Sequence, residues 1–126
     1  MTNFNSVVLV GRLTRDPELR YAPSGAPICS FTVATSRRIT AQDGRKEEQT
    51  TFLDVDAARR MAEICAQYLR KGRQVLVMGT LRQSRWVDPK TQEPRSKLRI
   101  VAQQVQFLGS SSASDGLANG NEASDE

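Results

Sequence analysis

The sequence predicts an all-β fold: a small five-stranded barrel with one α-helix and long β-hairpin arms. Three observations support this. Apolar residues recur at every second position in five separate runs, the spacing that places side chains on one face of a pleated strand. One segment alone has apolar residues at helical spacing. Turn sequences rich in proline, glycine and aspartate separate the runs, so successive strands can pair as hairpins.

The first strand is predicted over residues 7–13. Apolar residues alternate on one of its faces, while Val8 and Val10 occupy the other. We therefore expect both faces to be buried near the start of this strand, one of them in an interface. A proline ends the strand, and residues 18–21 form a short extended piece before a turn that contains proline and glycine.

The second and third strands are predicted to pair as a hairpin. The second runs from Pro27 to about Arg38 and the third from Gln49 to Ala58, with an Asp-Gly turn signal between them. Polar residues around this turn predict an arm that reaches into solvent. The side chains expected to face the core are Cys29, Phe31, Val33, Thr35, Leu53, Val55 and Ala57.

The helix is predicted over residues 59–71. Asp56 is a possible N-terminal cap, and two basic residues followed by Gly72 suit a C-terminus. Cys65 in the helix and Cys29 in the second strand are expected to be buried thiols. A disulfide between them is not expected in a chain without a secretion signal.

The fourth strand changes character halfway along residues 72–86. Apolar residues up to Leu81 alternate toward the core in the first half, whereas the second half carries Arg82, Arg85 and the only tryptophan, Trp86. A turn-rich segment and a basic fifth strand follow. This predicts a hairpin whose base lies in the barrel and whose arm carries cations and an indole into solvent.

Three strands, a helix and two further strands is the order of the OB-fold, a five-stranded Greek-key barrel, although the pattern alone also allows another five-stranded barrel. We assign residues 1–109 to this domain. Residues 110–126 are rich in serine, glycine, asparagine and acidic residues, so they cannot bury enough apolar surface to fold and are predicted to be a disordered acidic tail.

Positive charge is concentrated in the predicted domain. The chain has a net charge of +4, but its last 17 residues hold four acidic and no basic residues. Residues 1–109 therefore hold all 18 cations and ten of the 14 acidic residues, a net charge of +8. This imbalance favours nucleic acid as the partner, with membrane surfaces and acidic proteins as alternatives.

The chain begins without a secretion signal, and no apolar run is long enough to span a bilayer. We therefore expect a soluble cytoplasmic protein that does not bind membranes and that associates with the nucleoid.

Several short segments between residues 1 and about 109 form a specific set when they are taken together. They are Asn5-Ser6-Val7-Val8-Leu9-Val10-Gly11-Arg12-Leu13, Asp16-Pro17-Glu18-Leu19-Arg20-Tyr21, Ala34-Thr35-Ser36, Gln49-Thr50-Thr51-Phe52, Ala62-Glu63 with Tyr68-Leu69-Arg70-Lys71-Gly72, and Gly79-Thr80-Leu81-Arg82 with Trp86. In the order and spacing of these segments the chain resembles the bacterial single-stranded DNA-binding proteins. This resemblance implies an OB-fold, a homotetramer, no cofactor and sequence-tolerant binding of single-stranded DNA in replication, recombination and repair.

The resemblance also implies a set of nucleic-acid-binding residues. Phe52 and Trp86 fall where the family places aromatics that stack on bases. The cations at or beside its phosphate-contacting positions are Arg20, Arg60, Lys71, Arg82 and Arg85. Arg37 and Arg38, which lead into the first hairpin arm, complete the set. For Trp86 the alternative is packing against its own sheet or a neighbouring subunit.

Several features depart from the family pattern. Ile39 and Ala58 stand where further aromatics are common, and Asp54 stands where some members have a cation, so it is expected to oppose phosphate. The tail lacks the acidic tip ending in Ile-Pro-Phe, which leaves the recruitment of other replication proteins in doubt.

Three other functions remain open at this stage. Asp54 and Asp56 share a strand face, as a pair of metal-binding carboxylates in a nuclease would, but the chain has no histidine and no nucleophile paired with a base, so catalysis is not expected. An accessory or assembly module of the replication machinery with weak nucleic-acid binding is the main alternative. RNA binding is the third, because stacking does not distinguish the two backbones.

Overall fold

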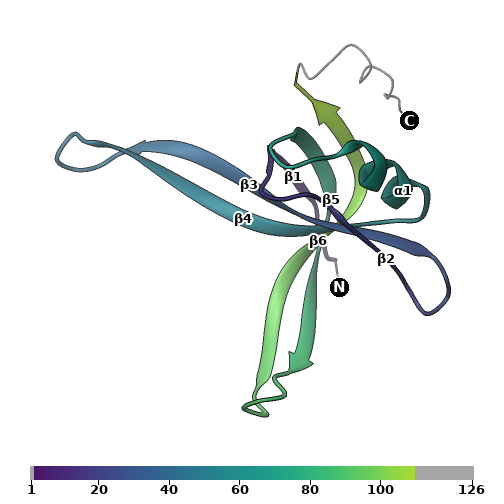
Figure 1. The fold of residues 1–126 in the computed structure, drawn as a ribbon. Coiled ribbons are helices and arrows are strands. Elements are labelled where there is room, and N and C mark those ends of the chain that lie inside the picture. Colours follow the sequence, from purple (N-terminus) through teal and green to yellow (C-terminus); the bar gives the residue numbers. More distant parts are fainter. Residues whose placement is uncertain (1, 110–126) are drawn as a thin grey trace.

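The structure, a computed structural model, describes residues 2–109; the tail predicted at 110–126 lies outside this range. Strands make up most of the described chain, and a single helix interrupts them (Figure 1). The elements are β1 (Val7–Leu13), β2 (Glu18–Tyr21), β3 (Pro27–Thr40), β4 (Lys46–Ala58), α1 (Arg59–Tyr68), β5 (Gln74–Val87) and β6 (Pro94–Leu108).

Five of the strands close into a barrel. The sheet has the order β1-β5-β6-β4-β3-β2, and an additional pairing of β1 with β3 closes it. All of these pairings are antiparallel except that of β4 with β6, which is parallel. This connectivity, with the helix between β4 and β5, confirms the predicted OB-fold. The short extended piece at residues 18–21 adds a sixth strand, β2, which pairs with β3 alone.

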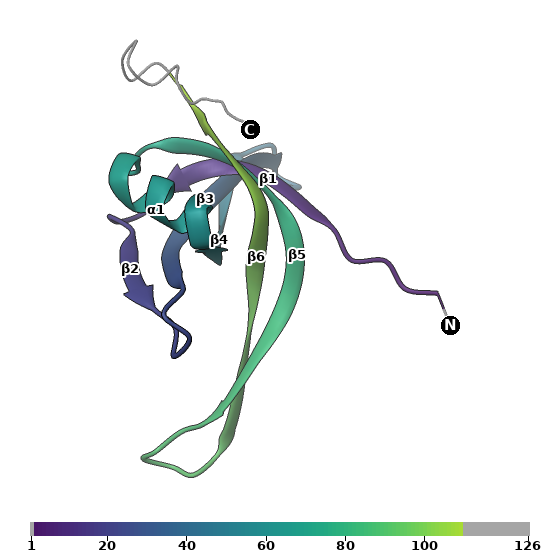
Figure 2. The same cartoon turned by 90° about the vertical axis from the view of Figure 1, so that its right-hand side faces the viewer.

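Both predicted hairpin arms are present, and they project from the barrel in different directions (Figures 1 and 2). β3 and β4 stay paired out to Thr40 opposite Lys46, and β5 and β6 out to Val87 opposite Pro94. The first arm is longer than predicted by two residues on β3 and three on β4. A tight turn, in which the Ala41 N–H donates to the Arg45 carbonyl (2.8 Å), lets the ladder continue.

Most of the alternating residues of the sequence fill the barrel, although Thr35 lies outside the buried core and Leu53 is only partly buried against it. The buried core contains Leu13, Cys29, Phe31, Val33, Val55, Ala57, Ala62, Cys65, Leu69, Val75, Val77 and Ile100. Leu81, which was predicted to belong to it, is 38% exposed. Leu81 lies opposite the buried Ile100 on the inner face of the sheet, but β5 leaves the barrel at this point and continues into the arm.

The outer face of β1 is not buried within the chain. Val8 is 59% exposed and lies opposite Met78 of β5, which is also exposed. Val10 on the same face is exposed as well. The chain alone therefore leaves an apolar strip on the barrel surface, and the expected burial of this face in an interface stays a prediction.

The helix differs from its prediction at both ends. The N-cap is Ala58, which makes no side-chain capping bond, because Asp56 is engaged on the sheet instead. The helix stops at Tyr68, since Leu69 is already extended, whereas it was predicted to continue to Lys71. None of the helices among residues 2–109 has the length and apolar character needed to cross a bilayer.

Both cysteines are buried and free, as expected. Burial, together with the nearby charge of Asp56, raises the pKa of the Cys29 thiol to about 11. Burial also raises the pKa of the Cys65 thiol. Both side chains therefore act as small apolar groups at neutral pH.

The register of β5 and β6 shifts at a glycine, because Met78 pairs with Gln104 and Gly79 with Ala102, which leaves an extra residue on β6. A Cβ atom at Gly79 would lie 2.1 Å from the Val101 carbonyl oxygen and 2.9 Å from its carbon, both backbone atoms of β6. Neither can move away as a side chain could, so any larger residue would push β5 from β6 where the barrel gives way to the arm.

We expect Gly79→Ala to lower the free energy of unfolding by about 1–3 kcal/mol, the usual range for overpacking. Thermal and urea unfolding at a fixed protein concentration will measure this. Gly25→Ala is the comparison. A Cβ atom there would meet nothing within 4 Å, so its cost comes only from the backbone φ of +92° and not from overpacking. A Gly79→Ala variant as stable as the wild type would contradict the close approach of the two backbones.

Candidate nucleic-acid interface

The outer face of the sheet carries a band of polar and charged side chains that crosses four strands of the barrel. Strand pairing places Arg82 of β5 opposite Arg99 of β6, Arg99 opposite Asp54 of β4, and Asp54 opposite Thr32 of β3. Since paired residues share a face, these side chains form one row. We call this face the outer band; it also holds Ser30, Phe52, Asp56 and Lys97, with Arg20 on β2.

Asp56 is the centre of the outer band. Arg99 binds it with two hydrogen bonds, from Nε to Oδ2 (2.8 Å) and from Nη2 to Oδ1 (2.6 Å). The Ser30 hydroxyl donates to Asp56 Oδ1 (2.7 Å) and accepts a hydrogen bond from Arg20 Nη1 (2.6 Å). Arg82 Nη2 lies 3.8 Å from Asp56 Oδ2. One carboxylate thus connects cations from three strands.

Asp54 forms a second, smaller group beside it. Thr32 donates a hydrogen bond to Asp54 Oδ1 (2.7 Å). Lys97 forms an ion pair with Oδ2, and Arg99 Nη1 lies 3.3 Å from the same oxygen. Arg99 therefore bridges both carboxylates from β6.

Both carboxylates are held in the charged form. Burial by itself would raise the pKa of Asp56, but hydrogen bonds from Arg99 and Ser30 and the charges of Arg99 and Arg20 outweigh it and lower the pKa. For Asp54 burial acts in the same direction, and hydrogen bonds from Lys97 and Thr32 with the charge of Arg99 again lower the pKa. The hydrogen bond to Asp56 raises the pKa of Arg99.

These contacts correct one expectation. Asp54 and Asp56 share a strand face, as the alternation predicts, and Asp56 is only 7% exposed while Asp54 is half-buried. Asp54 was expected to oppose phosphate, but four cations surround the two carboxylates and leave a net charge of +2. Their ligand positions are occupied by Arg99, Lys97 and two hydroxyls, an arrangement that does not resemble a metal site.

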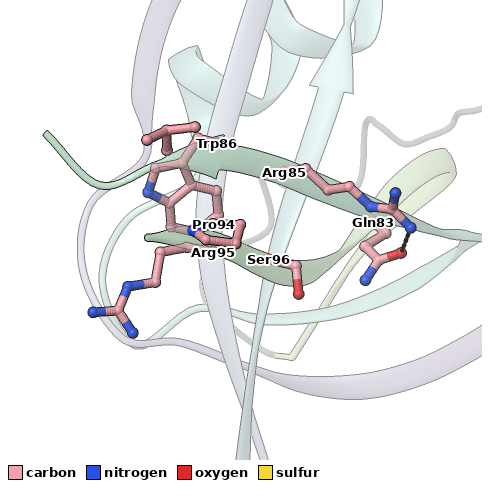
Figure 3. Close-up of a pocket in the computed structure, with 7 residues that line it drawn as sticks. Gln83, Arg85, Trp86, Pro94, Arg95 and Ser96 are labelled. Carbon is pink, nitrogen blue, oxygen red and sulfur yellow. Dashed lines mark hydrogen bonds between the residues drawn. The ribbon is translucent and has the colours of Figure 1, made fainter. Parts of the chain in front are cut away.

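The two predicted stacking residues are both open to solvent. Phe52 is 62% exposed and precedes Asp54 by two positions, so it lies on the outer band at the base of the first arm. Trp86 is 47% exposed and lies far out on the second arm, opposite Arg95. Figure 3 shows the indole beside Pro94 and Arg95 in a surface hollow formed by the two strands.

The cations of the second arm face two ways. Arg95 shares a strand face with Trp86 and lies 3.5 Å from Asp88 Oδ2 and 3.4 Å from Glu93 Oε1. Arg85 precedes Trp86 by one position and so belongs to the other face, where its Nη2 donates to Gln83 (2.9 Å; Figure 3). Arg85 therefore does not share a face with the tryptophan.

The remaining predicted cations lie away from the outer band. Arg37 and Arg38 are exposed on the first arm, and by alternation only Arg38 shares the face of Phe52. Arg60 is exposed in the first turn of α1. Lys71 follows the helix and is fixed through its backbone N–H, which donates to Asp16 Oδ1 (2.8 Å). The nine predicted residues thus do not form one continuous surface.

Arg99, Lys97, Ser30 and Thr32 were not among the predicted site residues. The two cations were visible in the sequence as part of an alternating basic stretch, residues 95–99. Their carboxylate partners lie 43 residues earlier, and only the parallel pairing of β4 with β6 brings them together.

Comparison with known proteins identifies the family. Residues 4–108 match the model of the Single-strand binding protein family. The chain belongs to this family. Relatives named "Single-stranded DNA-binding protein" include one from Wolinella succinogenes, 44% identical over 96% of this chain and 74% of the relative. Others come from Treponema pallidum, 49% identical over 87% of this chain and 61% of the relative, and Thermotoga maritima, 43% over 86% and 76%.

Solved structures of the family have the same fold. A Plasmodium falciparum SSB in complex with ssDNA superposes with a TM-score of 0.78 at 22% identity, covering 86% of this chain and 98% of the other. A deletion mutant of the single-stranded DNA binding protein from Thermus aquaticus gives 0.75 at 29% identity, over 86% of this chain and 52% of the other. These comparisons confirm the resemblance and the fold read from the sequence.

The buried carboxylates make stability depend on pH. Because the pKa values of Asp54 and Asp56 are lowered by folding, their contribution is complete above the unfolded value, about 3.9, and is lost as pH falls through the folded values. We expect the free energy of unfolding in urea to decrease below about pH 4. Asp56→Asn should be less stable at pH 7 and show a weaker acid dependence.

Asp43→Asn, on the exposed turn of the first arm, is the matched control and should keep the wild-type pH dependence. An Asp56→Asn variant whose stability changes with pH as steeply as that of the wild type would show that this carboxylate is not coupled to folding.

Proposed function

We propose that this chain binds single-stranded DNA without sequence preference and protects it during replication, recombination and repair. The single observation that supports this most directly is the outer band itself. It combines an exposed aromatic ring with a net positive surface, and a second exposed ring lies on the adjoining arm.

The mechanism needs no bond-making chemistry. Unpaired bases stack on Phe52 and Trp86, each with about 1–3 kcal/mol, and every base offers such a face. Arg20, Arg82 and Lys97 meet the phosphates and release counterions, which makes the affinity depend on salt. Duplex DNA binds poorly because its bases are already paired and stacked. Since Asp54 and Asp56 are committed to arginine and lysine, we assign the chain no catalytic role.

The other predicted cations have secondary roles in this proposal. Arg85, Arg37, Arg38, Arg60 and Lys71 surround the outer band on the arms and the helix, and a strand that wraps beyond the barrel would meet them. Residues 1–109 form the DNA-binding domain, and residues 110–126 form an acidic tail. We place the protein in the cytoplasm, where bacterial DNA lies.

We further propose that the chain works as a homotetramer. The apolar strip formed by Val8, Val10 and Met78 on β1 and β5 supports assembly, because such a surface is best buried against another copy. Met78 precedes Arg82 by four positions on the same face of β5, so the strip adjoins the outer band but includes none of its residues.

Trp86→Ala is expected to weaken binding of a dT oligomer by about 1–3 kcal/mol. In the wild type the fluorescence of Trp86, the only tryptophan, should be quenched on binding. For the wild type and for Trp86→Ala alike, the logarithm of the affinity should fall linearly with the logarithm of the salt concentration, with a slope of about 0.7 per phosphate contact. Fluorescence anisotropy of a labelled oligomer at several salt concentrations will measure the affinities of the two proteins.

Tyr21→Ala is the matched control, since Tyr21 is an exposed aromatic that occupies the opposite face of β2 from Arg20. It should bind as the wild type does. Unquenched Trp86 emission together with undiminished affinity of the Trp86 variant would remove the second arm from the site, and a wild type that does not bind dT would refute the function itself.

A further inference from the structure

The outer band contains a hydroxyl that links two charged groups. Ser30 donates its only proton to Asp56 and accepts a hydrogen bond from Arg20, so it passes the influence of the carboxylate on β4 to a guanidinium on β2. Both Ser30 and Asp56 are buried, whereas Arg20 at the outer end of this chain is exposed. The buried pair Ser30–Asp56 thus holds the exposed guanidinium of Arg20 through one of its N–H groups.

A carboxylate in a DNA-binding surface has two possible effects of opposite sign. It can repel phosphate, or it can hold cations in place. Both oxygens of Asp56 are occupied, by Arg99 at 2.6 and 2.8 Å and by Ser30 at 2.7 Å. Arg99 itself is mostly buried, so it neutralises Asp56 rather than reaching outward. The charge of Asp56 is therefore satisfied inside the surface, which favours the second effect.

We propose that Ser30 and Asp56 are positioning residues that hold Arg20 and Arg82 in the orientation in which they meet DNA phosphates. This inference rests on the function proposed above. An arginine is long and loses conformational freedom when it binds phosphate, so holding it beforehand reduces that loss. Because its guanidinium has five N–H donors and one is used on Ser30, the others stay available for phosphate.

The two arginines are held to different degrees. Arg20 has a hydrogen bond of 2.6 Å to Ser30, whereas Arg82 has only an ion pair of 3.8 Å with Asp56. Removing the Ser30 hydroxyl therefore releases Arg20 alone, and removing the Asp56 charge releases both. Ser30→Ala separates positioning from charge, because it changes no charge on the surface.

The first test compares Ser30→Ala with Ser36→Ala. Ser36 lies on the same face of β3 as Ser30, and its hydroxyl forms a hydrogen bond with the uncharged hydroxyl of Thr50. We expect Ser30→Ala to bind a dT oligomer about two- to tenfold more weakly than the wild type, the effect of leaving one side chain to be ordered on binding. Its salt dependence should be unchanged, and Ser36→Ala should bind as the wild type does.

A double-mutant cycle shows whether the hydroxyl acts through Arg20. Arg20→Ala should weaken binding and reduce the salt slope by about 0.7. Adding Ser30→Ala to it should cause no further loss. Wild-type affinity of Ser30→Ala, or losses of the two substitutions that simply add, would overturn the proposal.

Asp56→Asn gives the second test, because positioning of cations and repulsion of phosphate predict opposite changes in the affinity for a dT oligomer. Positioning predicts weaker binding even though a negative charge is removed, and repulsion predicts tighter binding. Circular dichroism and melting will show whether this variant folds, and if it does not, the Ser30 series decides. Wild-type binding of dT is measured first, so failure of the function and failure of this inference are distinct results.

Discussion

The ion pair between Arg99 and Asp56 is the interaction on which the barrel and its surface both depend. It lies where β4 and β6 run parallel for three residue pairs, one of the two strand pairings that join the halves of the barrel, the other being that of β1 with β3. On the inner side of this contact Val55 and Ile100 lie opposite each other in the core. On the outer side Arg99 binds both carboxylates. The same short pairing therefore joins core side chains and assembles the outer band.

This arrangement accounts for acidic residues in a surface that we propose for DNA. A buried carboxylate is stable only if its hydrogen-bonding positions are filled, and here arginine, lysine, serine and threonine fill them. Removing one partner would leave the others buried without compensation. The negative charges consequently stabilise the fold without appearing as a negative patch.

Much of the fold could be predicted from the sequence, because the period of apolar residues reports local structure directly. The five barrel strands, the helix and both arms were anticipated, and so was the core position of residues such as Phe31 and Val77. The exposure of Leu81 was not, because the alternation continues through it on the inner face and does not show where β5 leaves the barrel for the arm. The true end of the helix at Tyr68 was also missed, since basic residues and Gly72 beyond it mark a C-terminus only approximately.

The candidate site was predictable in its chemistry but not in its geometry. The aromatic rings and the excess of cations are properties of composition and alternation, so the sequence displays them. The state of Asp54 and Asp56 depends on residues of β2, β3 and β6 that are distant in sequence. No local pattern shows that Lys97 and Arg99 neutralise them. The remaining cations, Arg60 and Lys71 among them, stay a prediction that the described contacts do not test.

The two proposed stacking residues, Phe52 and Trp86, lie on different hairpins. Phe52 lies near the barrel, whereas Trp86 is carried far along a pair of strands that have no third strand beside them there. Two-stranded ribbons are the least supported part of a β-protein, and they bend and twist more easily than a closed barrel. Bending of the second arm therefore changes the distance between the two rings. A strand whose bases are unevenly spaced can be accommodated in this way by movement of the protein.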